Sequence, residues 1–396
     1  MTLSPPSGVS EQFRLSGVDA LRGVSVLLVV MHHIHLRFVL NQFNVDGELP
    51  KILNQVLFWS GYYAVTTFFV ISGFLITGLA IRRWRSLEHV PIGRFYTMRM
   101  ARILPCLFLA LIVLSALHLA GVGDFTIKPE RASLGRALWA AVTFHVNWLE
   151  GHRGYLPGGW DVLWSLSVEE VFYLLFPLVC LLVRSERLLL LPLLGLIVIG
   201  PINRTLLLDD DPWGFYAYLS CSDGIAFGCL AAIASARLKF SKRTLAVSLI
   251  TGAVAAVLVL LLFNEDEHIG IARFGLNFTL LEAGIAMMLL ALGSGVGNGA
   301  LAIGTGWLRA IGRRSYEIYL FHMFVVLGLM ELVREFKPQT AMIPAWYAAM
   351  LVLSIVLGSI VARWYSEPLN RRLRGSTRAC GDEARSLPVP AASEPR

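Results

Sequence analysis

Long apolar runs alternate with short polar connections along the chain. Ten of these runs are about 20 residues long, the length that an α-helix needs to cross the hydrocarbon core of a bilayer. Helices satisfy all of their backbone hydrogen bonds internally, as lipid requires. The sequence therefore predicts an all-α, polytopic membrane protein. We expect its spans near residues 18–37, 58–81, 102–121, 163–183, 188–206, 215–236, 245–263, 276–293, 315–333 and 345–363.

One further apolar and aromatic run, residues 134–149, is too short for a span. If it crossed the membrane, every later connection would change sides. We therefore predict a short interfacial or re-entrant helix at the outer face. The surrounding region, residues 124–161, contains Gly and Pro, and we expect its loops to line an entrance for an acceptor.

The charges of the connections predict the orientation of the chain. Arginine-rich connections follow every second span, whereas acidic ones, such as residues 209–211 and 265–267, lie between them. Basic residues mark the cytoplasmic side, so both termini are expected there. Arg334 and Lys337, in a short outer connection, are the exception. The domains expected are a cytoplasmic N-terminus (1–16), one membrane domain (17–373) and a disordered cytoplasmic tail (374–396).

The composition supports the membrane class. Of the 396 residues, 56% are hydrophobic and 15% are charged, and the mean hydropathy is +0.64. Soluble domains carry about 25% charged residues. The net charge of +7 therefore reflects a basic cytoplasmic side, and we predict no nucleic-acid partner. Residues 1–14 do not resemble a cleavable signal peptide, so the first run is expected to stay as a span. The five cysteines form no CxxC pair; we interpret them as packing residues and predict no metal site.

Ionisable residues in the first span are the first candidates for chemistry. Arg22 and His33 are eleven residues apart, so on a helix they lie about 20° apart around the axis and roughly 16 Å apart along it. Neutral imidazole is a suitable general base for a hydroxyl group. Arg22, with Asp19 beside it, is a candidate for binding an anionic donor. The alternative is that Arg22 reaches lipid headgroups and His33 is a hydrogen-bonded core residue.

Two stretches near the cytoplasmic side suggest how such a donor binds. Arg99 and Arg102 are three residues apart and are expected on one side of a helix start, where arginine forks and the helix dipole favour phosphate. Their alternative role is to mark the cytoplasmic side. Ser72 and Gly73 interrupt an apolar span. Small residues usually allow close helix packing. Here they can also leave room for a thin, extended part of the donor, such as a pantetheine arm, to pass along the helix.

Further ionisable residues lie inside the later spans. Glu169 and Glu170 are adjacent in an apolar helix, which is costly and hard to explain by packing. One of them is expected to orient a histidine and the other to pair with an arginine. Asp223 is a lone buried acid, and Ser315, Tyr316, Tyr319 and His322 recur at helical spacing. Tyr316 can also be an interfacial aromatic residue.

Together these stretches resemble the acyltransferase-3 family of integral membrane proteins, which includes O-antigen and exopolysaccharide O-acetylases and macrolide O-acyltransferases. The family places ten residues between the arginine and the histidine of its first helix, which selects Arg22 and His33. The matching stretches occur in the family's order: VDALRGVSVLLVVMHH, FFVISGFLITG, FYTMRMARILP, LWSLSVEEVFY, SDGIAFGCLAA, SYEIYLFH and RWYSEP.

The resemblance implies acyl-CoA, with acetyl-CoA expected, as donor substrate, and no permanently bound cofactor. The acceptor is expected to be a hydroxyl of a carbohydrate, such as a cell-surface polysaccharide or its lipid-linked precursor. The expected location is the bacterial cytoplasmic membrane, in contact with its lipid. The predicted catalytic residues are His33, Glu169 and Glu170. The predicted substrate-binding residues are Arg22, Asp19, Ser72, Arg99, Arg102, Asp223, Tyr316 and His322.

Two other interpretations stay open from the sequence. The chain could acylate a small glycosylated molecule such as a macrolide. It could instead be a flippase or transporter for a lipid-linked sugar, which also needs intramembrane charges. Binding of acyl-CoA distinguishes an acyltransferase from a transporter.

Overall fold

The fold is a bundle of long helices. The computed structural model describes residues 15–43, 49–262, 270–299 and 303–374. Within these ranges ten helices are long and apolar enough to cross a membrane, and there is no strand, so the predicted fold class is confirmed. The ten helices are α1 (Ser16–Leu40), α3 (Gly61–Trp84), α4 (Ile92–Leu119), α8 (Leu163–Val183), α9 (Glu186–Leu206), α11 (Tyr218–Arg237), α12 (Lys242–Leu262), α13 (Leu276–Gly293), α16 (Ser315–Phe336) and α17 (Ile343–Val361).

Short elements connect the long helices. On the expected outer side, the predicted helix at 134–149 is present as two helices, broken at Phe144, whose φ is 57°. Other short turns flank α1, α8 and α11. The short elements are α2 (Lys51–Asn54), η1 (Gln55–Trp59), η2 (Gly123–Phe125), α5 (Leu134–Val142), α6 (Val146–Arg153), α7 (Gly158–Asp161), α10 (Trp213–Tyr216), η3 (Gly270–Phe274), α15 (Gly306–Arg313), η4 (Thr340–Met342) and η5 (Ala362–Ser366).

The start of α4 differs from the prediction. The helix begins at Ile92 instead of near residue 102. The basic stretch before residue 102 contains good helix formers and no glycine or proline after Gly93, so it continues the apolar helix. Arg99 therefore lies about 10 Å from the helix N-terminus. The prediction that Arg99 and Arg102 lie at a helix start, where the helix dipole also favours phosphate, was wrong, because that effect fades within the first turn.

Glycines set the closest helix crossings. A Cβ on Gly73 of α3 would lie 2.0 Å from the carbonyl oxygen of Ile225 in α11, and one on Gly228 would lie 1.9 Å from that of Val70 in α3. The two backbones therefore touch, as small residues allow in membrane bundles. The packing role expected for Gly73 is confirmed, and the crossing turns its neighbour Ser72 towards a cavity.

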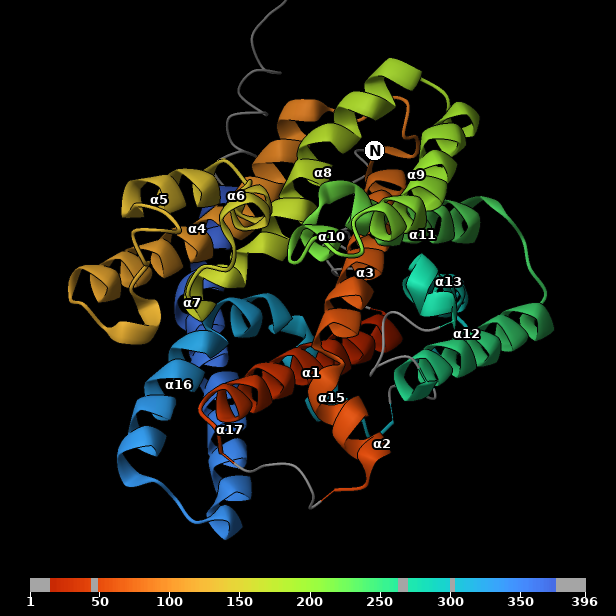
Figure 1. Ribbon diagram of the computed structural model, residues 1–396. Coiled ribbons are helices and arrows are strands. Elements are labelled where there is room, and N and C mark those ends of the chain that lie inside the picture. Colours follow the sequence, from red (N-terminus) through yellow and green to blue (C-terminus); the bar gives the residue numbers. More distant parts are fainter. Residues whose placement is uncertain (1–14, 44–48, 263–269, 300–302, 375–396) are drawn as a thin grey trace, which may run out of the picture.

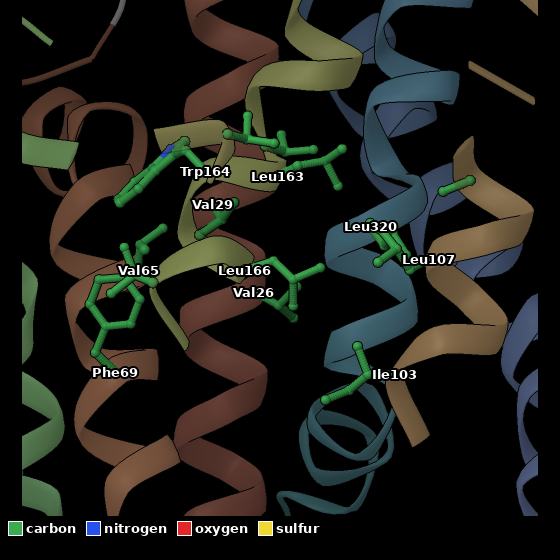
Figure 2. Packing of buried hydrophobic residues seen from close by; sticks show 14 of the residues in the cluster. Val26, Val29, Val65, Phe69, Ile103, Leu107, Leu163, Trp164, Leu166 and Leu320 are labelled. Carbon is green, nitrogen blue, oxygen red and sulfur yellow. The ribbon is translucent and has the colours of Figure 1, made fainter. Parts of the chain in front are cut away.

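The helix α1 occupies the middle of the bundle, with α16 and α17 at one side and α12 and α13 at the other (Figure 1). Its apolar face is fully buried at Val26 and Val29. Figure 2 shows these two side chains near Leu166 of α8, with Val65 of α3 and Leu320 of α16 to either side, all within one core cluster. Tight packing of α3, α8 and α16 around these residues of α1 fixes the direction in which its polar residues point.

The expected cytoplasmic tail lies outside the described residues, apart from Arg374, and so do residues 1–14. Arg334, the exception to the charge pattern, is explained by its partners. Its guanidinium contacts Asp124 at 2.5 Å and Glu331 at 3.0 Å, so its charge is balanced locally.

Candidate functional site

A large cavity opens between α1, α3, α4, α8, α16 and η5. Its volume is about 820 Å³, which is within the range of small-molecule sites. Arginines dominate its polar lining, and six of the residues predicted to bind substrate lie there. These are Asp19, Arg22, Ser72, Arg99, Arg102 and Tyr316. The predicted acids Glu169 and Glu170 also line it.

Several cavity residues were missed by the sequence reasoning. Five further arginines line the cavity, and all of them lie in stretches that the sequence explained by topology alone. They are Arg82, Arg313, Arg314, Arg371 and Arg374. These arginines come from separate connections, and only the fold brings them together. The one sequence signal for them was that they were all predicted on the cytoplasmic side of the membrane. The lining thus holds eight arginines against five acids, Asp19, Glu169, Glu170, Glu317 and Glu367.

A hydrogen-bond network joins α3 and α8 at the cavity wall. The Tyr173 hydroxyl donates to Glu169 Oε2 at 3.3 Å and is also in contact with the Ser72 hydroxyl. Since a phenol has one proton, Ser72 must be the donor in the second contact. The Arg99 guanidinium lies 4.5 Å from the centroid of the Tyr173 ring. Glu170 is 5% exposed, and its Oε1 has no partner among the described residues.

His33 is paired with the other histidine that the sequence singled out. His33 Nδ1 lies 2.9 Å from the Val29 carbonyl oxygen and 3.3 Å from His322 Nε2. His322 Nδ1 lies 2.5 Å from the Tyr319 carbonyl oxygen. A carbonyl oxygen only accepts, so both Nδ1 atoms carry the proton in the neutral rings. This assignment leaves His33 Nε2 as a bare acceptor, which is the form that a general base requires.

The histidine pair lies beyond the inner wall of the cavity. Neither histidine lines it, whereas Tyr319, one turn before His322 on α16, does. The Tyr319 hydroxyl donates to the Val162 carbonyl oxygen at 3.0 Å and accepts from Ser165 at 2.7 Å. Tyr319 therefore borders the cavity and also lies near His322, with ring centroids 5.9 Å apart. His33 itself is half-buried and His322 is fully buried.

The structure does not bring His33 to the glutamates. The sequence reasoning expected Glu169 or Glu170 to hold the imidazole, but the polar contacts given for His33 are with Val29 and His322. Both acids point instead into the space shared with the arginines. The reason is the rotation of α8 about its axis, which turns Glu169 and Tyr173 together towards the cavity.

Asp223 lies apart from this site. It is fully buried and accepts two hydrogen bonds from Arg204, one at 3.0 Å to Oδ1 and one at 2.5 Å to Oδ2. The pair joins α9 to α11, and Asp223 is not part of the cavity lining. The described geometry gives Asp223 a structural partner within the bundle.

A second group of acids lies in the outer region. Glu150 of α6 is fully buried, and its Oε1 accepts from the Leu156 backbone N–H at 3.0 Å. Asp161 of α7, which accepts from the Tyr216 hydroxyl at 3.1 Å, lies beside it. Burial, and then repulsion by Asp161, raise the pKa of Glu150 well above its ordinary value. A protonated Glu150 can share its proton with Asp161.

The match to known proteins covers the helices that build this site. A family model described as an acyltransferase domain (acyltransferase 3) matches residues 15–364. The peptidoglycan O-acetyltransferase OatA of Listeria monocytogenes is 23% identical over 376 residues, covering 89% of this chain and 55% of that protein. The O-acetyltransferase OatA of Staphylococcus aureus is 25% identical over 381 residues, covering 90% of this chain and 57% of that protein.

The chain spans about half the length of these curated relatives. No solved structure matches it significantly. The region matched by the family model contains the ten long helices up to the end of α17, the histidine pair and most of the cavity lining. The chain therefore belongs to the acyltransferase-3 family of multi-pass membrane acyltransferases, with a distant relation to the OatA O-acetyltransferases.

Proposed function

We propose that this protein transfers an acetyl group from acetyl-CoA to a hydroxyl of a carbohydrate polymer or its lipid-linked precursor. The observation that carries the proposal is the arginine-lined cavity, whose lining includes Tyr319, a neighbour of His322 in the His33–His322 pair. A cationic space suits a phosphorylated donor, and a bare imidazole nitrogen suits removal of a hydroxyl proton. In the orientation that the loop charges predict, both termini are cytoplasmic.

The donor occupies the cavity. The phosphates of CoA bind Arg99 and Arg102, with Arg22 deeper along the same wall. The pantetheine arm passes Ser72 towards Tyr319, and the acetyl group reaches His33 when the Tyr319 side chain moves aside. The cavity volume of about 820 Å³ is large enough for a ligand of this size class. Glu169 and Glu170 limit the net positive charge between the phosphates and the reacting end.

The chemistry needs one proton transfer in each direction. His33 Nε2 takes the proton of the acceptor hydroxyl as its oxygen attacks the thioester carbonyl carbon. The C–S bond then breaks, and the imidazolium returns the proton to the departing CoA sulfur. His322 orients the His33 ring through the contact at Nδ1. A thioester is already activated, so positioning and proton removal provide most of the acceleration.

The acceptor is inferred from the relatives. One of them is named for acetylating peptidoglycan, which is a carbohydrate polymer. Such an acceptor is too large for the described cavity, whose lining does not include the half-buried His33. The acceptor therefore approaches His33 from the outer side, past residues 124–161.

The test compares His33→Ala with the wild type in purified, full-length protein supplied with radiolabelled acetyl-CoA and carbohydrate acceptors. Loss of a general base should lower turnover by about 10³-fold, while acetyl-CoA binding stays normal. His89→Ala, at an exposed histidine between α3 and α4 that does not line the cavity, is the matched control. Unchanged turnover in His33→Ala contradicts the mechanism, and a wild type that neither binds nor consumes acetyl-CoA supports a transporter instead.

A further inference from the structure

Arg37 lies on α1 one turn beyond His33, towards the expected outer side. Four residues of helix place the two side chains about 40° apart around the axis and roughly 6 Å apart along it. Arg37 is close enough to act electrostatically on both His33 and His322. It is therefore a second cation of α1 near the reacting group, on the side opposite to Arg22.

The Arg37 guanidinium has no ion-pair or hydrogen-bond partner within the described ranges, and its Nε is buried without one. The side chain as a whole is only half-buried. A buried donor without a partner lowers the stability of the folded protein. Such a cost is easily understood when a ligand supplies the missing acceptor.

The two nearest carboxylates are engaged elsewhere. Asp124 and Asp161 both lie within electrostatic range of Arg37. Asp124, however, is paired with Arg334 at 2.5 Å. Asp161 accepts from the Tyr216 hydroxyl and lies against Glu150. Neither acid forms an ion pair with Arg37, so an anion from outside the chain has a donor to bind.

The backbone of α7 leaves room for this guanidinium. A Cβ on Gly158 would lie 2.2 Å from Arg37 Nη2 and 2.7 Å from the terminal carbon of Met323, the residue after His322. The Arg37 head group therefore lies against Gly158 of the outer region and close to Met323 of α16. This placement points the cation at the route by which an acceptor reaches His33.

We propose that Arg37 binds an oxyanion of the acceptor, either a carboxylate or a phosphate, and so selects anionic carbohydrates. The inference rests on the proposed function and names its substrate class. Arginine forks match both kinds of oxyanion. With the anion held at Arg37, a hydroxyl of the same sugar reaches His33 Nε2 one helical turn away.

The test measures sugar binding by calorimetry to purified, full-length protein saturated with CoA, which occupies the inner arginines. The probes are galacturonate, galactose 1-phosphate and neutral galactose. We expect the wild type to bind at least one of the two anionic sugars about tenfold more tightly than galactose. Arg37→Gln should remove that difference, and Arg37→Lys should keep part of it. The two anionic probes distinguish a carboxylate acceptor from a phosphorylated one.

Arg273→Gln, at an exposed arginine of η3 outside residues 124–161, is the matched control and should bind as the wild type does. Equal binding of all three sugars, no binding of any, or an anion preference that survives in Arg37→Gln would overturn the proposal. A thermal unfolding transition like that of the wild type shows that each variant is folded. If CoA fails to bind, the proposed function is contradicted. The Arg37 proposal is still tested in that case, because the sugar titrations can be repeated without CoA.

Discussion

Two groups of charges inside the bundle differ in how their burial is compensated. In the first, Arg204 and Asp223 form a bidentate pair with side chains that are 5% and 0% exposed. Arg204 also donates to Thr279 Oγ1 and to the Ser220 and Gly275 carbonyl oxygens. Nearly every polar atom of this pair finds a partner inside the protein, which is what a buried ion pair needs to persist.

The cavity arginines are arranged differently. Within the described parts of the chain, no ion pair within 4.0 Å joins Arg22, Arg99 or Arg102 to Glu169 or Glu170. These groups border an open space instead. From the sequence alone, Asp223 and Glu170 look alike, since each is an acid in an apolar helix. The difference is that one is matched by the protein, whereas the other group leaves its charges accessible to a ligand.

The largest expected effect comes from breaking the matched pair. Asp223→Ala leaves the Arg204 cation buried without its partner, which should lower the free energy of unfolding by about 3–5 kcal/mol. The measurement is thermal or denaturant unfolding in detergent. Replacing both residues by apolar ones of similar volume should restore most of the loss. If Asp223→Ala is as stable as the wild type but fails to bind substrate, Asp223 belongs to the second group.

For a cavity arginine we expect weaker ligand binding with little change in stability. Arg102→Gln removes one of the proposed phosphate ligands, so acetyl-CoA should bind about tenfold more weakly, while the unfolding transition stays within a few tenths of a kcal/mol of the wild type. Arg94→Gln, at an exposed arginine of the same helix that is not part of the cavity lining, is the control. Equal loss of affinity in both variants would show that the arginines act only through the general positive charge.

The membrane architecture follows from the sequence because the bilayer sets the length of each span. All ten predicted spans correspond to observed helices. Their ends were less predictable. The helix α4 extends through Arg94 and Arg99 because helix propensity continues beyond the apolar run. The break at Phe144 depends on tertiary contacts and has no local glycine or proline signal.

The members of the candidate site followed from the sequence better than their contacts did. Helical spacing places Arg22 and His33 on one face of α1, which depends on one helix only. The partner of His33 depends on how α8 and α16 pack on α1, and no spacing rule predicts it. For the same reason the acids expected at His33 lie in the cavity, and the neighbour of His33 is His322. Arg37 had no sequence signal beyond its position one turn after His33.

Glu150 shows a third way to bury an ionisable group, which is to keep it neutral. Its Oε1 accepts one backbone hydrogen bond, and its Oε2 lacks a described partner apart from the neighbouring Asp161. Burial is the main reason that its pKa lies well above the ordinary value of 4.5. The folded protein therefore holds a proton that the unfolded chain releases above that pH.

This difference in proton binding predicts a modest pH dependence of stability. The contribution of Glu150 is fully present below its ordinary pKa and is lost as the pH rises towards its folded pKa. The apparent melting temperature of the wild type should therefore fall between pH 5 and pH 8. Glu150→Gln is neutral throughout, keeps the acceptor for Leu156, and should reduce that fall by a few degrees. Glu130→Gln, at an exposed acid of the same region, should leave it unchanged. A slope in Glu150→Gln equal to that of the wild type would mean that Glu150 is buried as a carboxylate, and Arg37, which acts electrostatically on the neighbouring Asp161, would then be required to balance the charge of the two acids.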